Sequence, residues 1–208
     1  MEQQTPEWQA ARLGKASASR IADIIARTKS GYSTSRANYA AELVCERLTG
    51  VAAESYVSAA MQWGLEKEPE AQRLYAFERD VHVERVGFVD HPRIAMSGAS
   101  PDGLVGEDGL IEVKCPLTAT HIETLLGRSV PSRYACQMMW QLAVTGRQWC
   151  DFVSYDPRLP LNLRLFIRRV YRDDAIIAAL EAEVAAFLAE IDTTLAKLSA
   201  FAPETEAA

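Results

Sequence analysis

The chain has 208 residues, of which 49% are hydrophobic and 24% are charged, so it is long enough to enclose a sizeable core and has no bias toward disorder. The longest apolar run is too short to span a membrane, and the first residues lack the basic and apolar segments of a signal peptide. We therefore expect one domain over residues 1–208, in the cytoplasm. The four cysteines are widely and irregularly spaced, which favours reduced, mostly buried thiols over a zinc or iron–sulfur site.

The net charge of −6 argues at first against a nucleic-acid partner, but the charges are unevenly distributed. Residues 12–36 carry six basic side chains against one acid, and residues 158–172 carry five arginines and no acid. Residues 173–208 hold eight carboxylates against one lysine, a net −7, which leaves +1 for the rest of the chain. The sequence therefore predicts a local basic surface that is compatible with DNA.

The apolar pattern predicts helices and strands that alternate along the chain. Pro6 opens a short helix that ends near Gly14, and Ser17 or Ser19 caps a second helix that runs to residue 25. Further helical spacing is found over 35–48, 58–79 (with a proline kink or restart at 69), 118–126, 132–145 and 173–198. A flexible loop is expected at 30–33, and strands are expected over 81–89, 94–96, 99–105, 110–113, 149–155 and 161–170. This order favours an α/β fold in which helices flank a central sheet.

The most informative stretch is residues 100–116. Apolar residues at 104–105, 110–111 and 113 flank a Gly-Glu-Asp-Gly cluster, which predicts a β-hairpin. Because strand side chains alternate between faces, Glu112 and Lys114 share one side, Val113 points into a core, and Asp102 can approach from the neighbouring strand. Two carboxylates beside an ammonium group suit a divalent cation such as Mg²⁺ and a phosphodiester substrate. The same pattern also arises by chance on an exposed strand, so the motifs around it decide between a catalytic site and ordinary surface charges.

Two motifs in this stretch, Ser-Pro-Asp-Gly-Leu at 100–104 and Glu-Val-Lys-Cys-Pro at 112–116, resemble those of the PD-(D/E)xK nucleases. Within that group the chain is similar to the phage lambda exonuclease (YqaJ-like) family of viral recombination exonucleases, and the matching motifs extend from about Trp8 to Pro157. The resemblance implies a single nuclease domain with a restriction-endonuclease-like core, in which α-helices flank a central mixed β-sheet.

The resemblance also implies a site for two Mg²⁺ ions, in which Mn²⁺ can replace Mg²⁺. It assigns Asp102 as the ligand shared by both ions and Glu112 and the Val113 carbonyl as further ligands. Lys114 orients the attacking water. Two cations about 4 Å apart can hold the attacking and the leaving oxygen of an in-line displacement.

One further ligand is expected from the preceding helix. The family's Trp-Gly-x-x-x-Glu pattern begins at Trp63 and assigns this role to Glu68. Glu66, two residues earlier, points around the helix and is the weaker candidate. Without the hairpin, either glutamate would indicate only a solvated helix face.

A second motif, Arg12-Leu13-Gly14 followed by Ser17-Ala18-Ser19, lies at a helix start. Arginine offers a bidentate fork to phosphate, and a capping serine with free helical amides completes an anion site. In the resembled family this constellation holds the 5′-phosphate of the recessed strand, which here implies Arg12, Ser19 and Ser100. Alternatively, Ser19 only caps the helix and Arg12 only pairs with a carboxylate.

Three more residues match family positions. Tyr134 and Gln137 match Tyr-x-x-Gln, which places Gln137 near the scissile phosphate or Lys114, although such a pair is often plain helix packing. Met61 matches the apolar wedge that unstacks the end base pair, although a core methionine is the alternative. The three histidines lie outside the matched motifs, and we assign them structural or surface roles.

The resemblance implies a Mg²⁺-dependent 5′-to-3′ exonuclease that acts on double-stranded DNA ends. It would release 5′-mononucleotides and leave 3′ overhangs for recombination by single-strand annealing, as a ring-shaped homotrimer partnered by a phage-type annealing protein. One alternative is a restriction-like endonuclease of the same fold, for which a free-end phosphate pocket has no use. The other is a catalytically silent DNA-end-binding module, against which the intact Asp102, Glu112 and Lys114 argue.

Overall fold

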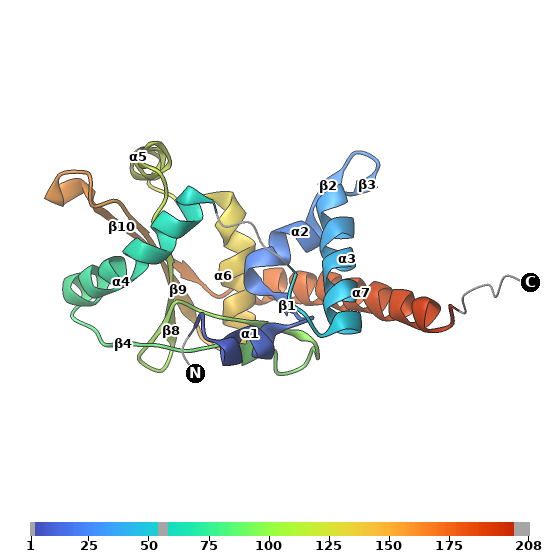
Figure 1. Cartoon of the computed structure of the whole chain (residues 1–208). Coiled ribbons are helices and arrows are strands. Elements are labelled where there is room, and N and C mark those ends of the chain that lie inside the picture. Colours follow the sequence, from blue (N-terminus) through green and yellow to red (C-terminus); the bar gives the residue numbers. More distant parts are fainter. Residues whose placement is uncertain (1–2, 54–57, 202–208) are drawn as a thin grey trace, which may run out of the picture.

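A five-stranded mixed sheet forms the centre of the computed structural model, which describes residues 3–53 and 58–201 (Figure 1). Its strands, in spatial order, are β10 (Leu165–Tyr171), β9 (Trp149–Tyr155), β8 (Gly109–Lys114), β7 (Gly103–Val105) and β4 (Val83–Glu84). The β8–β9 pair is parallel and the other pairs are antiparallel. The predicted hairpin is therefore present as β7 and β8, and it lies inside the sheet, which helices flank as expected.

Two smaller sheets lie outside this centre. Parallel β1 (Ala16–Ser17) and antiparallel β5 (Val89–Asp90) flank β6 (Ser97–Ala99), and β2 (Arg27–Thr28) pairs with β3 (Gly31–Tyr32). The single strand predicted over 81–89 is wrong, because β4 and β5 belong to different sheets. The strand predicted over 94–96 is also wrong: the segment turns, and the backbone amides of Arg93 and Ile94 donate to Nδ1 of His91 at 3.2 and 3.0 Å.

The helices follow the predicted pattern closely. They are α1 (Pro6–Arg12), α2 (Ile21–Ile25), α3 (Thr34–Thr49), α4 (Ala59–Arg79), α5 (Thr118–Gly127), α6 (Ser132–Thr145) and α7 (Asp174–Ser199), with 3₁₀ turns at Ala18–Arg20 and Leu161–Leu163. Thr5 caps α1 by accepting from the Trp8 amide at 3.2 Å, and α4 continues across Pro69. The expected serine cap of the second helix is wrong, since neither Ser17 nor Arg20, the residues preceding the 3₁₀ turn and α2, makes a side-chain capping bond. None of the described helices is long and apolar enough to cross a membrane.

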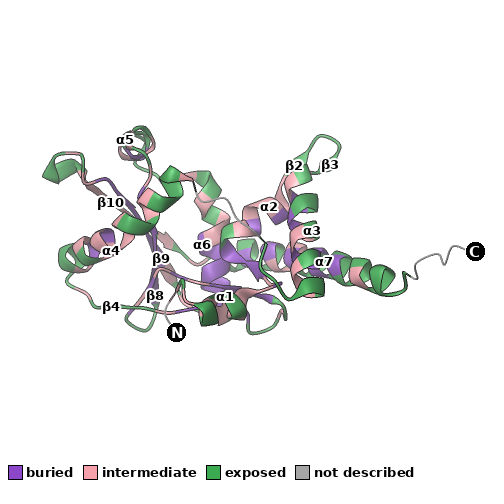
Figure 2. Cartoon of the chain, in the orientation of Figure 1, coloured by how far each residue is buried: buried purple, intermediate pink, exposed green. Residues whose placement is uncertain are grey.

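The sheet separates two hydrophobic clusters (Figure 2). On one side α4 packs Ala71 and Tyr75 against Ile111 and Val113, and on the other α2, α3, α6 and α7 pack around Leu110 and Phe152 of the sheet. Alternation along β8 therefore turns Ile111 and Val113 toward α4 and Leu110 and Glu112 toward α6. This alternation places a carboxylate, Glu112, against a helix in the interior.

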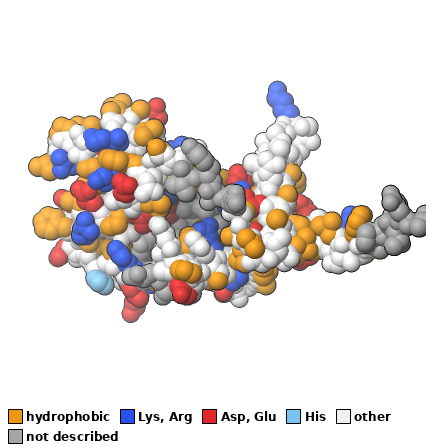
Figure 3. All heavy atoms as spheres, in the orientation of Figure 1, with side chains coloured by type: hydrophobic (Ala, Val, Ile, Leu, Met, Phe, Trp, Pro, Cys, Tyr) orange, Lys and Arg blue, Asp and Glu red, His pale blue; other side chains and the backbone are white. Residues whose placement is uncertain are grey.

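The acidic C-terminal helix lies against much of the basic N-terminal segment. Arg27 pairs with Glu183 at 2.8 Å, and Arg36 pairs with Glu190 at 2.7 Å. Three arginines of the other arginine-rich segment are also paired: Arg158 with Asp156, Arg169 with Asp151 and Arg172 with Asp174. Ion pairs therefore neutralise much of the predicted local basic surface, and in the view of Figure 3 blue side chains are scattered rather than gathered.

Candidate active site

The hairpin brings three of the predicted residues together at one end of β8. The Val113 amide donates to Oδ2 of Asp102 at 2.6 Å, which fixes the aspartate across the strand pair. Lys114 forms an ion pair with Oε1 of Glu112, two residues earlier on the same face. An aspartate, a glutamate and a lysine thus converge because two strands pair in register.

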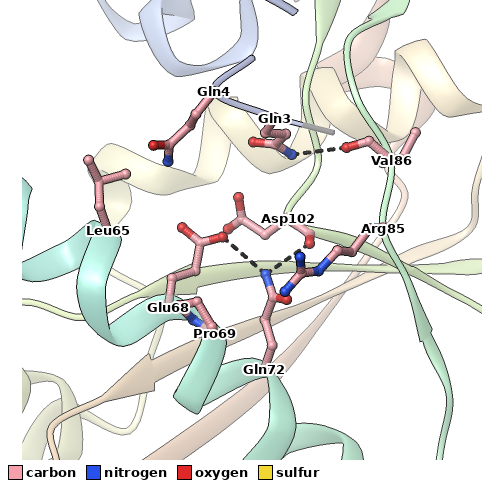
Figure 4. Close-up of a pocket in the computed structure, with 9 residues that line it drawn as sticks. All are labelled: Gln3, Gln4, Leu65, Glu68, Pro69, Gln72, Arg85, Val86 and Asp102. Carbon is pink, nitrogen blue, oxygen red and sulfur yellow. Dashed lines mark hydrogen bonds between the residues drawn. The ribbon is translucent and has the colours of Figure 1, made fainter. Parts of the chain in front are cut away.

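Helix α4 supplies the fourth predicted residue. Glu68 and Asp102 line one cavity of about 150 Å³, and Nε2 of Gln72 donates to Oε1 of Glu68 and to the carbonyl oxygen of Asp102, both at 3.0 Å (Figure 4). Glu66 is exposed and hydrogen-bonds to Gln62 instead. The structure therefore brings Glu68, the expected candidate, to the site. Gln72 was missed, since no pattern in the sequence links it to Asp102.

Helix α6 contacts the glutamate from the opposite face. Nε2 of Gln137 donates to Oε1 of Glu112 at 2.6 Å, and Nε2 of Gln141 donates to Oε2 at 2.6 Å. Tyr134 lies beside the lysine, with its ring centroid 5.3 Å from Nζ of Lys114. Gln141 was missed by the sequence analysis, although its position four residues after Gln137 puts both on one helical face.

The cluster contains more acidic groups than basic ones, and this shifts their pKa values. Burial and the nearby Glu112 raise the pKa of both Asp102 and Glu68, that of Asp102 well above its ordinary value. Burial alone would lower the pKa of Lys114, but Glu112 and Asp102 outweigh it and raise that pKa, so the side chain is an ammonium. The adjacent Cys115 is a neutral thiol, because burial raises its pKa to about 12. Three carboxyl groups, those of Glu68, Asp102 and Glu112, therefore surround a single positive charge, the ammonium of Lys114.

The donor set fits a hard divalent cation that prefers oxygen ligands. A cation would relieve the repulsion that raises the pKa of Asp102 and Glu68. In the described part of the chain, no group of three or more acidic, histidine or cysteine side chains encloses a cation as it stands. Instead, Lys114 and the two glutamines of α6 occupy both oxygens of Glu112. A metal ion that binds Oε1 of Glu112 would therefore have to replace one of the two donors on that oxygen.

A second cavity, of about 510 Å³, is lined by two of the three predicted phosphate residues, Arg12 and Ser19. Its lining includes Trp8, Arg12, Ser19 and Met61, and Met61 is 53% exposed rather than part of the core. Ser100 contacts this group through Trp8, whose Nε1 donates to the serine Oγ at 2.8 Å. Because Ser100 is two residues from Asp102, one short segment connects the cavity to the carboxylates.

Arg12 is the distinctive side chain of this cavity. Its guanidinium lies 4.3 Å from the centroid of the Trp8 ring, and burial lowers its pKa. Within the described residues no carboxylate lies within ion-pair distance of it. By contrast, Arg20 in the same cavity pairs with Asp23 at 2.6 Å and with Glu42 at 3.0 Å. Among the described residues, Arg12 therefore does not pair with a carboxylate, which was the alternative role considered for it.

The histidines have structural surroundings, as expected. Buried His121 contacts Oγ of Ser154 at 2.7 Å and the carbonyl of Leu163 at 2.9 Å. The His91 ring stacks on Trp140 at 4.9 Å. His82 is exposed.

Comparisons with known proteins agree with this geometry. The YqaJ-like viral recombinase domain matches residues 7–148. The structure of LHK-Exo in complex with dAMP is 55% identical, with a TM-score of 0.88 over 93% of this chain and 96% of that chain. The alkaline exonuclease LHK-Exo from Laribacter hongkongensis is 54% identical, with a TM-score of 0.88 over 94% and 96%. A phage-related exonuclease from Haemophilus somnus 129PT, 17% identical with a TM-score of 0.72 over 88% and 96%, supports the fold alone. Among curated proteins, none matches significantly.

A mixed sheet that holds Glu112 and Lys114 on β8 and Asp102 directly before the neighbouring strand β7, in a fold shared with these exonucleases, defines the chain as a nuclease. The chain belongs to the YqaJ-like viral recombinase family. Every candidate site residue lies inside the matched range.

Proposed function

We propose that this chain is a Mg²⁺-dependent 5′-to-3′ exonuclease that acts as one nuclease domain on double-stranded DNA ends and releases 5′-mononucleotides. The observation that carries the proposal is Arg12, which has no carboxylate within ion-pair distance among the described residues and lies in a cavity joined, through Ser100, to the carboxylate and lysine cluster at Asp102. A guanidinium that stacks on Trp8 without a neutralising carboxylate can bind an anion, and a terminal phosphate supplies one. An enzyme that cuts within DNA has no need for such a pocket.

The residues that would hold two Mg²⁺ ions are Glu68, Asp102, Glu112 and the carbonyl of Val113. When bound, the metal would activate the attacking water and neutralise charge on the leaving oxygen. Lys114 is a donor beside Glu112, where it can orient that water. Gln137 reaches the same carboxylate and Tyr134 confines the ammonium, so both act in positioning.

The end-recognition pocket uses neutral and charged donors together. Arg12 offers two parallel N–H groups to the 5′-phosphate, and Ser19 and Ser100 offer hydroxyls. Trp8 contacts both residues, since its ring lies against the Arg12 guanidinium and its Nε1 donates to Oγ of Ser100. Exposed Met61 at the rim is suited to wedge against the last base pair.

The direction of digestion and the partners come from the family. We propose that three copies form a ring around DNA and that a phage-type single-strand annealing protein receives the 3′ overhang. A ring suits this chain, because its basic segments are largely neutralised and offer little electrostatic hold on DNA.

One assay tests the nuclease assignment. Linear duplexes with 5′-phosphate or 5′-hydroxyl ends and a covalently closed circle are incubated with the protein, with and without Mg²⁺, beside the Asp102→Ala variant. We expect mononucleotide release from the linear duplexes only, faster with 5′-phosphate, and dependent on both Mg²⁺ and Asp102. Cleavage of the circle would identify an endonuclease instead, and binding of ends without release would identify a silent module.

A further inference from the structure

The carboxylate of Glu112 has no exposure to solvent and accepts from three donors. Lys114 and Nε2 of Gln137 share Oε1, whereas Nε2 of Gln141 alone holds Oε2 at 2.6 Å. The two oxygens are therefore held differently, one by two donors and one by a single amide.

The two glutamines also differ in burial. Gln137 is partly exposed, next to Lys114, and can move aside. Gln141 has 0% exposure inside α6, so it has no room to leave Oε2. A metal ion that reaches Glu112 can therefore take Oε1 by displacing Gln137, while Oε2 stays on Gln141.

Packing does not explain an amide at position 141. Among the described residues, its Oε1 atom is buried without any hydrogen-bond partner, which is destabilising. A methionine of similar length would fill the space without that buried carbonyl oxygen. What methionine lacks is the donor that reaches Glu112.

We propose that Gln141 is a positioning residue that fixes the plane of the Glu112 carboxylate and presents Oε1 to the metal. Gln141 holds Oε2 through a neutral donor, so the negative charge of Glu112 stays available to the metal ion. A second lysine in the same place would neutralise that charge. This inference rests on the proposed function, because it takes Glu112 to be a metal ligand.

The test compares Gln141→Met with Met138→Leu, a volume-conserving change at a fully buried position of the same helix. Binding of Mn²⁺ alone is measured by calorimetry on the full chain, and DNA digestion is measured against Mg²⁺ concentration. For Gln141→Met we expect metal affinity to fall about 10- to 100-fold and the Mg²⁺ needed for half-maximal rate to rise in parallel. Met138→Leu should bind Mn²⁺ as the wild type does. Circular dichroism and Tm establish that both variants are folded.

Equal Mn²⁺ affinity of folded Gln141→Met and wild type would overturn the proposal. A second measurement needs no variant at position 141: the side-chain amide signals of the wild type are assigned by triple-resonance NMR, checked with Gln137→Ala, and then followed on titration. On adding Mg²⁺ we expect the Gln137 amide to lose protection and the Gln141 amide to keep it. Loss of protection at Gln141 would equally refute the idea. Absence of metal-dependent cleavage by the wild type would instead refute the proposed function.

Discussion

Replacing Arg12 by alanine tests whether its unpaired guanidinium receives the DNA end. A hydrogen bond to a charged group is worth about 1.5–3 kcal/mol, and about 1.4 kcal/mol corresponds to a factor of ten. Losing one such interaction with a 5′-phosphate should therefore lower kcat/KM about 10- to 150-fold. Duplex with a 5′-hydroxyl lacks the anion, so it should be slowed much less.

The loss of the contact with Trp8 affects both substrates alike, so the informative quantity is the ratio of kcat/KM for 5′-phosphate over 5′-hydroxyl duplex. Arg20→Ala is the matched control, because Arg20 lines the same cavity but is already paired with Asp23 and Glu42. That variant should leave the ratio near the wild-type value. If Arg12→Ala slows both substrates equally, Arg12 is a structural residue and the end-recognition pocket is wrongly assigned.

Three further outcomes are expected. Lys114→Ala should abolish cleavage but keep metal-dependent DNA binding in a gel-shift assay, because the carboxylates remain; wild-type-like digestion would remove Lys114 from the mechanism. Burial alone would raise the pKa of Asp156, but hydrogen bonds from Arg158 and Thr118 lower it from 3.8 to about 2, which corresponds to about 2 kcal/mol of stability. That stability is present above pH 3.8 and is lost as pH falls toward about 2. The difference in unfolding free energy between wild type and Asp156→Asn should therefore shrink over this range. A constant difference would show that these hydrogen bonds do not lower the pKa of Asp156. Light scattering should give about three times the 23.0 kDa chain mass, and digestion started at low salt should continue after salt and trap DNA are added; a monomer, or immediate arrest, would exclude the ring.

The sequence by itself determined the local half of this site. The two-residue period of strands put Glu112 and Lys114 on one side of β8, and the predicted hairpin let Asp102 approach from the neighbouring strand, where it accepts from the Val113 amide. Glu68 was preferred over Glu66 because it matches the resembled family's Trp-Gly-x-x-x-Glu pattern, and because a residue two positions away points around the helix. The positions of these side chains were predictable because they follow from geometry that repeats over a few residues.

The tertiary structure decided what depends on distant segments. Gln141 meets Glu112 from 29 positions away, and Gln72 meets the backbone of Asp102 from 30 positions away, so nothing near either residue in the chain reveals the contact. The segment at 12–36 contains six basic side chains and one acid, yet α7 folds back from about 150 residues downstream to neutralise Arg27 and Arg36, while Arg12 has no carboxylate within ion-pair distance among the described residues. The reason is physical: a charge or an amide acts on whatever lies within a few ångströms, and only folding brings those neighbours together.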